Sequence, residues 1–252
     1  MPVPDIRKYI RPEVMPTPFC PGCGHGILMH CILIAIDELN LDFDRMVFVS
    51  GIGCAAWIPS PHFAADTLHT THGRPVAYAT GVKLYRPELD VVVISGDGDL
   101  VSIGGNHLIH AARRNIGLTV IMANNKVYGM TGGQLASTTP HGCITSTTPG
   151  GNPERDFDTC RLMLAAGAEY VARQTVAAPK DLIAVIKGAL EFERFSFTEV
   201  MTNCPTHFGR MNDVPAPADM IEALKNSAVK GGREELLTRP LPEGKFYVGR
   251  FT

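Results

Sequence analysis

The 252-residue sequence lacks long apolar runs, basic clusters and an export signal. No apolar stretch approaches the roughly 20 residues that a helix needs to cross a bilayer. The N-terminal segment carries charges and prolines where a signal peptide has an apolar centre, so we expect no membrane span and a cytoplasmic protein. Basic charge is scarce too, because 23 Lys and Arg oppose 25 Asp and Glu and no basic run is longer than Arg113-Arg114. A nucleic-acid partner is therefore not expected.

Internal repeats and a paired set of cysteines are also absent. The seven cysteines are an odd number in a chain of this size, which argues against a secreted disulfide framework. Cys31 and Cys160 fall on apolar helical patterns, where a free cysteine acts as a small core residue. Four others flank glycine or proline outside the predicted elements, and their soft thiolates suit either zinc or an iron-sulfur cluster: Cys20, Cys23, Cys54 and Cys204. One Cys-x-x-Cys pair and two distant single cysteines leave both metals open.

The apolar pattern predicts strands that alternate with helices. The strands are expected at residues 45–50, 91–95, 118–124, 169–173 and 195–201, and the helices at 25–39, 74–86, 103–115, 156–167 and 179–194. The strands are apolar on both faces, which is typical of a parallel sheet covered by helices on both sides. The predicted class is a doubly wound α/β fold.

Three parts are expected along the chain. Prolines make residues 1–19 an extended arm that wraps a neighbour, residues 20–204 form the α/β domain, and residues 205–252 form an extension that docks a subunit, with one helix at 217–232. The loop at 127–153 is rich in Gly, Ser and Thr, and a loop of this length in a compact domain is usually functional.

Two carboxylates follow the strand at 91–95, in the sequence Gly96-Asp97-Gly98-Asp99. Ligands of parallel sheets bind beyond the carboxyl ends of the strands, yet this loop has Val101 where a dinucleotide fingerprint has its third glycine. A carboxylate repels a bare phosphate, unless Mg²⁺ lies between them. Asn124 and Asn125, at the end of the next strand, supply further oxygen ligands. A plain β-turn with solvated carboxylates is the alternative.

The Gly-Asp-Gly loop and the later Asn-Asn pair resemble the thiamine diphosphate motif. The resemblance implies that Asp97, Asn125 and the carbonyl of Val127 hold Mg²⁺ against the diphosphate. With "CPGCGHG", "SGIGCAAW", "THGR" and "MTNCPT", residues 15–210 resemble the thiamine-binding β subunit of 2-oxoacid:ferredoxin oxidoreductases. The fold implied is the thiamine diphosphate-binding fold, in its diphosphate-binding half.

This resemblance implies an enzyme subunit that oxidatively decarboxylates a 2-oxoacid with coenzyme A. Electrons pass through a 4Fe-4S cluster to ferredoxin, and the cluster ligands are Cys20, Cys23, Cys54 and Cys204. 2-Oxoglutarate is the first expectation for the substrate, and branched-chain, aromatic or pyruvate-type 2-oxoacids are the second. A non-redox thiamine-dependent decarboxylase or synthase subunit, with zinc or no metal on the thiols, is the competing hypothesis.

The residues expected to contact the cofactor follow from the same resemblance. They are Ile52, Gly53, Cys54, His72, Gly96, Asp97, Gly98, Asp99, Asn125, Val127, Gly129, Met130 and Thr131. His72 is also the candidate for a catalytic role. The loop at 51–56 literally fits a nicotinamide fingerprint, but Pro59 and Pro61 interrupt the helix that this fingerprint requires.

The resemblance also implies partners. The glutamate that activates the pyrimidine of thiamine lies on a separate domain, for which this chain has no room, so an α subunit is expected to supply it, with further small subunits possible in the complex. Some relatives that oxidise 2-oxoglutarate carry a basic residue at the position of Trp57 and Lys at that of Gly132. A tryptophan at this position also suits an apolar or aromatic 2-oxoacid, or the substrate carboxylate is bound by the α subunit.

Overall fold

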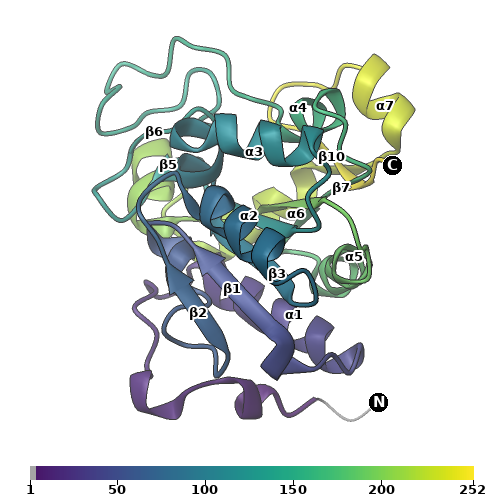
Figure 1. The fold of residues 1–252 in the computed structure, drawn as a ribbon. Coiled ribbons are helices and arrows are strands. Elements are labelled where there is room, and N and C mark those ends of the chain that lie inside the picture. The colour runs from purple at the N-terminus through teal and green to yellow at the C-terminus, as the bar shows by residue number, and fades with distance from the viewer. Residues whose placement is uncertain (1–3) are drawn as a thin grey trace.

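A mostly parallel sheet runs through the centre of the computed structural model, which describes residues 4–252 (Figure 1). Its strand order is β2-β1-β3-β4-β8-β7-β10-β9. The strands are β1 (Met46–Ser50), β2 (Asp66–His69), β3 (Asp90–Gly96), β4 (Thr119–Asn124), β7 (Tyr170–Thr175), β8 (Ser196–Met201), β9 (Ala228–Lys230) and β10 (Phe246–Arg250). The predicted α/β class is confirmed, and each of the five predicted strands is present.

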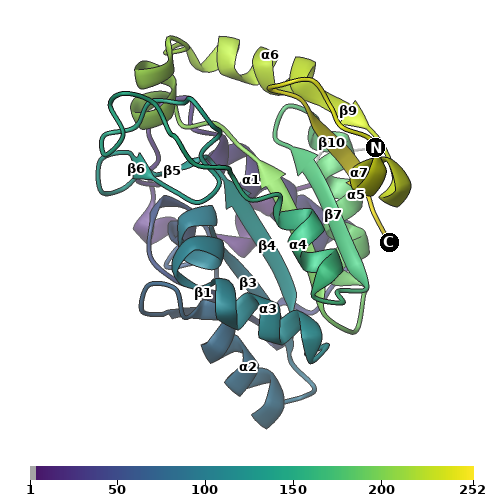
Figure 2. The ribbon, with the colours of Figure 1, turned by 90° about the horizontal axis from the view of Figure 1, so that it is seen from above.

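Helices cover both faces of this sheet, as the sequence predicted (Figure 2). They are α1 (Gly24–Glu38), α2 (Pro75–Tyr85), α3 (Gly105–Arg113), α4 (Thr159–Ala165), α5 (Pro179–Leu190), α6 (Pro217–Ser227) and α7 (Arg233–Thr238). Val92 and Ile94 of β3 pack into the core beneath α1 and α5, whereas Val91 and Val93 pack into the core beneath α2, α3 and α4. Because successive side chains of a strand point to opposite faces, a strand buried on both sides must be apolar throughout.

The N-terminal arm packs on its own chain, below β1 and β2 in Figure 1. Tyr9 is buried and its hydroxyl donates to Asp37 at 3.0 Å, and the Arg11 guanidinium donates to the carbonyl of Pro61 at 2.9 Å. These contacts fix the arm against the domain, while the expected wrapping of a neighbour stays a prediction. Residues 1–3 of the predicted arm lie outside the described residues.

The C-terminal extension returns to the sheet. The helix expected at 217–232 ends at Ser227, and β9 follows directly. β10 then pairs with β7 in the antiparallel direction and with β9 in parallel, so the sheet is not parallel throughout. Leu236, Tyr247 and Phe251 are buried in the core on the α2 and α3 side. Residues 228–251 therefore complete the sheet edge, drawn in yellow in Figure 2, and a further role in docking a subunit remains a prediction.

Two other elements differ from the expectation. The segment between Pro61 and His72 contains β2, which pairs in parallel with β1. The loop at 127–153 contains a short hairpin of β5 (Val127–Tyr128) and β6 (Gln134–Leu135). Within residues 4–252, none of the helices has the length and apolar character needed to span a membrane.

Candidate cofactor site

Four neighbouring parallel strands end at one edge of the sheet and present the expected site residues there. β1, β3, β4 and β8 lie side by side in that order. The loop after β1 carries Cys54, β3 leads into Asp97, β4 ends at Asn124 beside Asn125, and Cys204 follows β8. From β1 the chain forms β2 on one side of β1 and then β3 on the other side. Open α/β sheets bind ligands at such a switch point.

A cavity of about 60 Å³ lies at this edge, and all thirteen residues expected to contact the cofactor line it. The cavity also includes Ala55 and Tyr128. Residues that are up to 79 positions apart in the chain, from Ile52 to Thr131, thus converge on one small space. Their convergence is what the structure shows, and the assignment of each to a cofactor atom stays a prediction.

Asp97 provides a buried carboxylate at the centre of this cavity. It is 1% exposed, and loss of solvent raises the pKa of its carboxyl group to about 6. The Thr138 hydroxyl donates to it, and this bond and the nearby backbone amides of Gly98 and Asn125 oppose that rise. The Asn125 side-chain oxygen accepts from the N–H of Val127 at 3.2 Å, which orients the amide. A carboxylate and an amide oxygen are therefore placed as hard oxygen donors in one pocket, a set suited to Mg²⁺.

The other carboxylate of the loop, Asp99, is satisfied by protein groups. Its Oδ1 accepts from the N–H groups of Ile52 (3.2 Å) and Gly73 (2.7 Å), and its Oδ2 accepts from the Ser95 hydroxyl at 2.8 Å. Nδ1 of His72 lies at hydrogen-bond distance from the same Oδ1. Asp99 therefore lines the cavity but acts by holding the 51–54 loop and His72 in place.

Glycines keep this part of the site open. Gly98 is required by the close approach of Tyr128, since a Cβ at this position would lie 2.6 Å from a carbon of the tyrosine ring. Gly96, by contrast, would meet nothing nearer than Ala55 at 3.8 Å. The protein itself therefore demands a glycine at position 98, whereas at position 96 it leaves space that a ligand can use.

A second cavity, of about 220 Å³, adjoins the first. Its lining includes Cys20, Cys23, Cys54 and Cys204, and it shares Cys54, Asn125, Gly129 and Met130 with the first cavity. A Cβ on Gly129 would lie 3.6 Å from the Cys54 sulfur and 3.7 Å from the Cys204 sulfur. The four cysteines predicted as metal ligands thus meet in one place, next to the carboxylate site, although they come from chain segments up to 184 positions apart.

Three of these four thiols are partly or fully buried, whereas Cys20 is exposed. Burial raises the pKa of Cys23 to about 12 and that of Cys54 to about 11, and the neighbouring thiols add to both shifts. The backbone amides of His25 and of residues 206–208 lie near Cys23 and Cys204, respectively, and partly oppose the rise in the pKa of these two thiols. In residues 4–252, no three His, Cys, Asp or Glu side chains are arranged to hold a single metal ion.

Comparisons with known proteins agree with this geometry. The family of thiamine pyrophosphate enzymes, C-terminal TPP binding domain, matches residues 51–200. A 2-oxoglutarate synthase subunit KorB of Methanocaldococcus jannaschii is 49% identical over 97% of this chain and 90% of its own length. The chain belongs to the beta subunits of the 2-oxoacid:ferredoxin oxidoreductases. The predictions of the family, the enzyme class and a thiamine diphosphate-binding domain are confirmed.

More distant members of the oxidoreductase family agree. The 2-oxoacid:ferredoxin oxidoreductase subunit beta of Saccharolobus solfataricus is 41% identical over 75% of this chain and 62% of its own length. A structure of the 2-oxoglutarate:ferredoxin oxidoreductase from Magnetococcus marinus superimposes with a TM-score of 0.87 and 35% identity, covering 100% of this chain and 85% of the other. That structure was solved with 2-oxoglutarate, coenzyme A and succinyl-CoA bound.

Sequence reasoning missed the groups that support the site of this oxidoreductase subunit. Thr138, which donates to Asp97, lies 41 residues further along the chain, in the loop that was flagged only for its length and composition. Tyr128 donates to the carbonyl of Gly98 at 3.1 Å and packs edge-on against His72. Its position between Val127 and Gly129, two residues expected to contact the cofactor, is the feature of the sequence that points to it.

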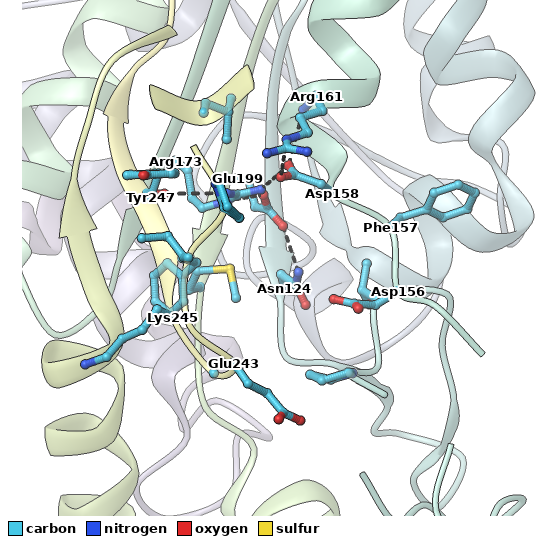
Figure 3. Close-up of a pocket in the computed structure, with 18 of the residues that line it drawn as sticks. Asn124, Asp156, Phe157, Asp158, Arg161, Arg173, Glu199, Glu243, Lys245 and Tyr247 are labelled. Atoms are coloured by element: carbon cyan, nitrogen blue, oxygen red, sulfur yellow. Dashed lines mark hydrogen bonds and ion pairs between the residues drawn. The ribbon is translucent and has the colours of Figure 1, made fainter. Parts of the chain in front are cut away.

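A polar network centred on Arg173 of β7 and Glu199 of β8, next to β4, was missed as well (Figure 3). Arg173 and Glu199 form an ion pair at 2.6 Å, and both are at most 6% exposed. Glu199 also accepts from the Asn124 amide at 2.7 Å, and Arg173 pairs with Asp158 at 2.6 Å. These residues line a cavity of about 490 Å³ under the C-terminal extension. The network fixes Asn124 and thereby the start of the loop that carries Asn125.

Proposed function

We propose that this chain is the beta subunit of an enzyme that oxidatively decarboxylates 2-oxoglutarate, with coenzyme A, to succinyl-CoA and CO₂. Electrons pass through a 4Fe-4S cluster to ferredoxin. The observation that carries the proposal is the contact between the two cavities, one with a buried carboxylate and one with four thiols, through Cys54, Asn125, Gly129 and Met130. The electron source and the electron acceptor would then lie side by side.

The residues around Asp97 fit magnesium and a diphosphate. Asp97 and Asn125 supply side-chain oxygens, and the carbonyl of Val127 is the third expected protein ligand. The raised pKa of Asp97 in the metal-free chain supports this, because a divalent cation would remove the cost of burying the carboxylate. Thr138 would keep the carboxylate turned towards the cation. Thiamine diphosphate, when bound here, supplies the nucleophilic carbon for attack on the 2-oxo group.

The four cysteines fit an iron-sulfur cluster, because they line one cavity that adjoins the carboxylate cavity, where a redox group could take electrons from the bound cofactor. Thiolates are also the ligands that iron-sulfur clusters use. The nearby backbone amides of His25 and of residues 206–208 would compensate part of the negative charge on the bound sulfurs of Cys23 and Cys204.

His72 would hold a proton at the reacting centre. Its Nδ1 bonds to Asp99, which leaves Nε2 as the group that can exchange a proton with substrate or cofactor. The ring is partly exposed and lines the same cavity as Asp97. Asp99 would act as the positioning residue that fixes the orientation of this ring.

An α subunit would complete the active site. Sites for small molecules typically enclose about 300–1,000 Å³, and the carboxylate cavity has only about 60 Å³. The chain therefore supplies the diphosphate end, and the remaining wall, with the glutamate of the pyrimidine side, would come from the partner. Further small subunits, ferredoxin and coenzyme A are the other expected partners, and such a complex would work in the cytoplasm.

The substrate proposal follows the relatives. Four relatives that are 47–50% identical carry the name 2-oxoglutarate synthase subunit KorB. Trp57 lines the thiol cavity and offers no charge to a second carboxylate. We therefore assign recognition of the distal carboxylate to the α subunit.

The test is the composition and activity of the complex with its α subunit, purified without oxygen. The proposal requires iron, sulfide and thiamine diphosphate on this subunit, and coenzyme A-dependent reduction of ferredoxin by 2-oxoglutarate in preference to pyruvate or branched-chain 2-oxoacids. Thiamine diphosphate without iron or sulfide would instead indicate the non-redox decarboxylase or synthase. A preference for a branched-chain or aromatic acid would refute 2-oxoglutarate as the substrate and indicate that Trp57 selects the substrate side chain.

A further inference from the structure

His25 is a buried side chain whose polar atoms find no partner in residues 4–252. It is 1% exposed, and neither ring nitrogen makes a hydrogen bond. It is the second residue of α1, two positions after Cys23, and its ring lines the cavity of the four cysteines. A buried polar group without a partner is uncommon and calls for a ligand or a strong structural reason.

Phe19 and the four cysteines line the cavity around the His25 ring, together with the polar side chains of Asn125, Thr206 and His207. Phe19 packs against the His25 ring in an edge arrangement with ring centroids 5.7 Å apart. A neutral imidazole always carries one N–H donor, whichever tautomer it adopts. Four cysteine sulfurs line the same cavity, and a neutral thiol is a weak acceptor, in agreement with a ring that makes no hydrogen bond. A sulfur atom bound to iron carries more negative charge and is a stronger acceptor.

We propose that His25 donates its ring N–H to a sulfur atom of the iron-sulfur cluster and raises the reduction potential of that cluster. The inference rests on the proposed function, because it requires the cluster in this cavity. Hydrogen bonds to the sulfurs are one of the factors that set the potential of such clusters. The bond favours the reduced cluster, because the added electron increases the negative charge on the sulfurs.

His62 provides a matched control. It is also 1% exposed and also lies beside Phe19, with ring centroids 6.3 Å apart. Its Nδ1, however, bonds to the carbonyl of Trp57 at 2.6 Å, and it is not among the residues that line the thiol cavity. Replacing either histidine therefore removes a buried ring beside Phe19, but of the two only His25 lines the cavity of the four cysteines.

The experiment is an EPR-monitored redox titration of the complex with its α subunit, for the wild type, His25→Phe, His25→Gln and His62→Phe. We expect His25→Phe to lower the ratio of reduced to oxidised cluster about tenfold at a fixed potential, a shift of about 59 mV for one electron. His25→Gln, which retains a donor, should recover at least half of the shift, and His62→Phe should match the wild type.

Each outcome separates the inference from the proposed function. A wild-type complex without a cluster signal refutes the proposed function itself. A normal signal with an unchanged potential in His25→Phe refutes only the role of His25, as does an equal shift in His62→Phe. If His25→Phe assembles no cluster, pulsed EPR of the wild-type complex, labelled with ¹⁵N only in the histidine rings, decides. The inference then requires a histidine ring nitrogen coupled to the cluster that persists in His207→Gln, a variant that removes the other histidine of the cavity. Absence of that coupling overturns the inference.

Discussion

Replacing each carboxylate of the Gly-Asp-Gly-Asp loop by its amide should change stability in opposite directions. Asp97 and Asp99 are both 1% exposed and two residues apart. Burial raises the pKa of Asp97 from 3.8 to about 6 in the metal-free chain. A shift of about two units corresponds to roughly 3 kcal/mol, because one unit is worth about 1.4 kcal/mol. Asp97→Asn removes that cost and should stabilise the metal-free subunit by about 1–3 kcal/mol at pH 8.

The sign follows from linkage. A carboxyl group whose pKa is higher in the folded state than in the unfolded state destabilises the fold above its folded pKa, here about 6, and this cost disappears as the pH falls towards 3.8. The advantage of Asp97→Asn should therefore shrink between pH 7 and pH 4. At any pH the variant should bind magnesium and thiamine diphosphate poorly, because the charge on the metal ligand is lost.

Asp99→Asn should destabilise the same subunit. Its carboxylate accepts from two backbone N–H groups and the Ser95 hydroxyl and also bonds to His72, and an amide cannot preserve all of these bonds. A loss of about 2–4 kcal/mol is expected for a buried group of this kind. Urea unfolding with EDTA present, followed by the fluorescence of Trp57, the single tryptophan, measures both variants. Equal destabilisation by the two substitutions would refute the assignment of Asp97 as a ligand held in readiness for a cation.

Three further predictions address the cofactor, the cluster and the network behind the site. Magnesium-dependent binding of thiamine diphosphate, measured by calorimetry, should weaken up to about tenfold per pH unit below the Asp97 pKa of about 6 and be flat above it; a flat profile down to pH 4.5 would contradict this. Cys23→Ala should abolish the visible absorbance of the cluster and ferredoxin reduction, while thiamine diphosphate binding partly survives. Cys31, a buried cysteine outside the cavity, provides the control, because Cys31→Ala should keep the absorbance and ferredoxin reduction. Intact ferredoxin reduction in Cys23→Ala would refute the ligand assignment. Arg173→Met leaves the Glu199 charge buried and should cost about 3–5 kcal/mol in urea unfolding, and adding Glu199→Gln should restore part of it; additive losses would argue against the pair.

The fold was largely predictable because its strands are buried on both faces. Runs such as residues 91–95 are apolar without alternation, and helical patterns separate them, so the parallel sheet follows from sequence. β2 escaped prediction because its residues Asp66–His69 are mostly exposed at the sheet edge and show no apolar run. β9 and β10 escaped because they are held by pairing with distant β7 and with each other, not by local pattern.

The site was predictable where its chemistry lies in short motifs. Asp97, Asn125 and the four cysteines stand in recognisable loops, and the structure gathers them at one edge of the sheet. The groups that orient them depend on contacts between distant segments, as for Thr138 with Asp97. The same holds for the role of Asp99, whose partners at Ile52 and Gly73 are 47 and 26 residues away. Spacing along the chain does not encode such hydrogen bonds.

The proposed transfer of electrons from the carboxylate cavity to the thiol cavity is tested most directly by a single turnover without ferredoxin. The oxidised complex, purified with its α subunit, would be mixed with 2-oxoglutarate under anaerobic conditions, frozen and examined by EPR. The account predicts a reduced-cluster signal only when magnesium and thiamine diphosphate are bound, and none in Asp97→Asn reconstituted with the same cluster content. A signal that forms without thiamine diphosphate, or a loaded complex in which 2-oxoglutarate reduces no cluster, would contradict it.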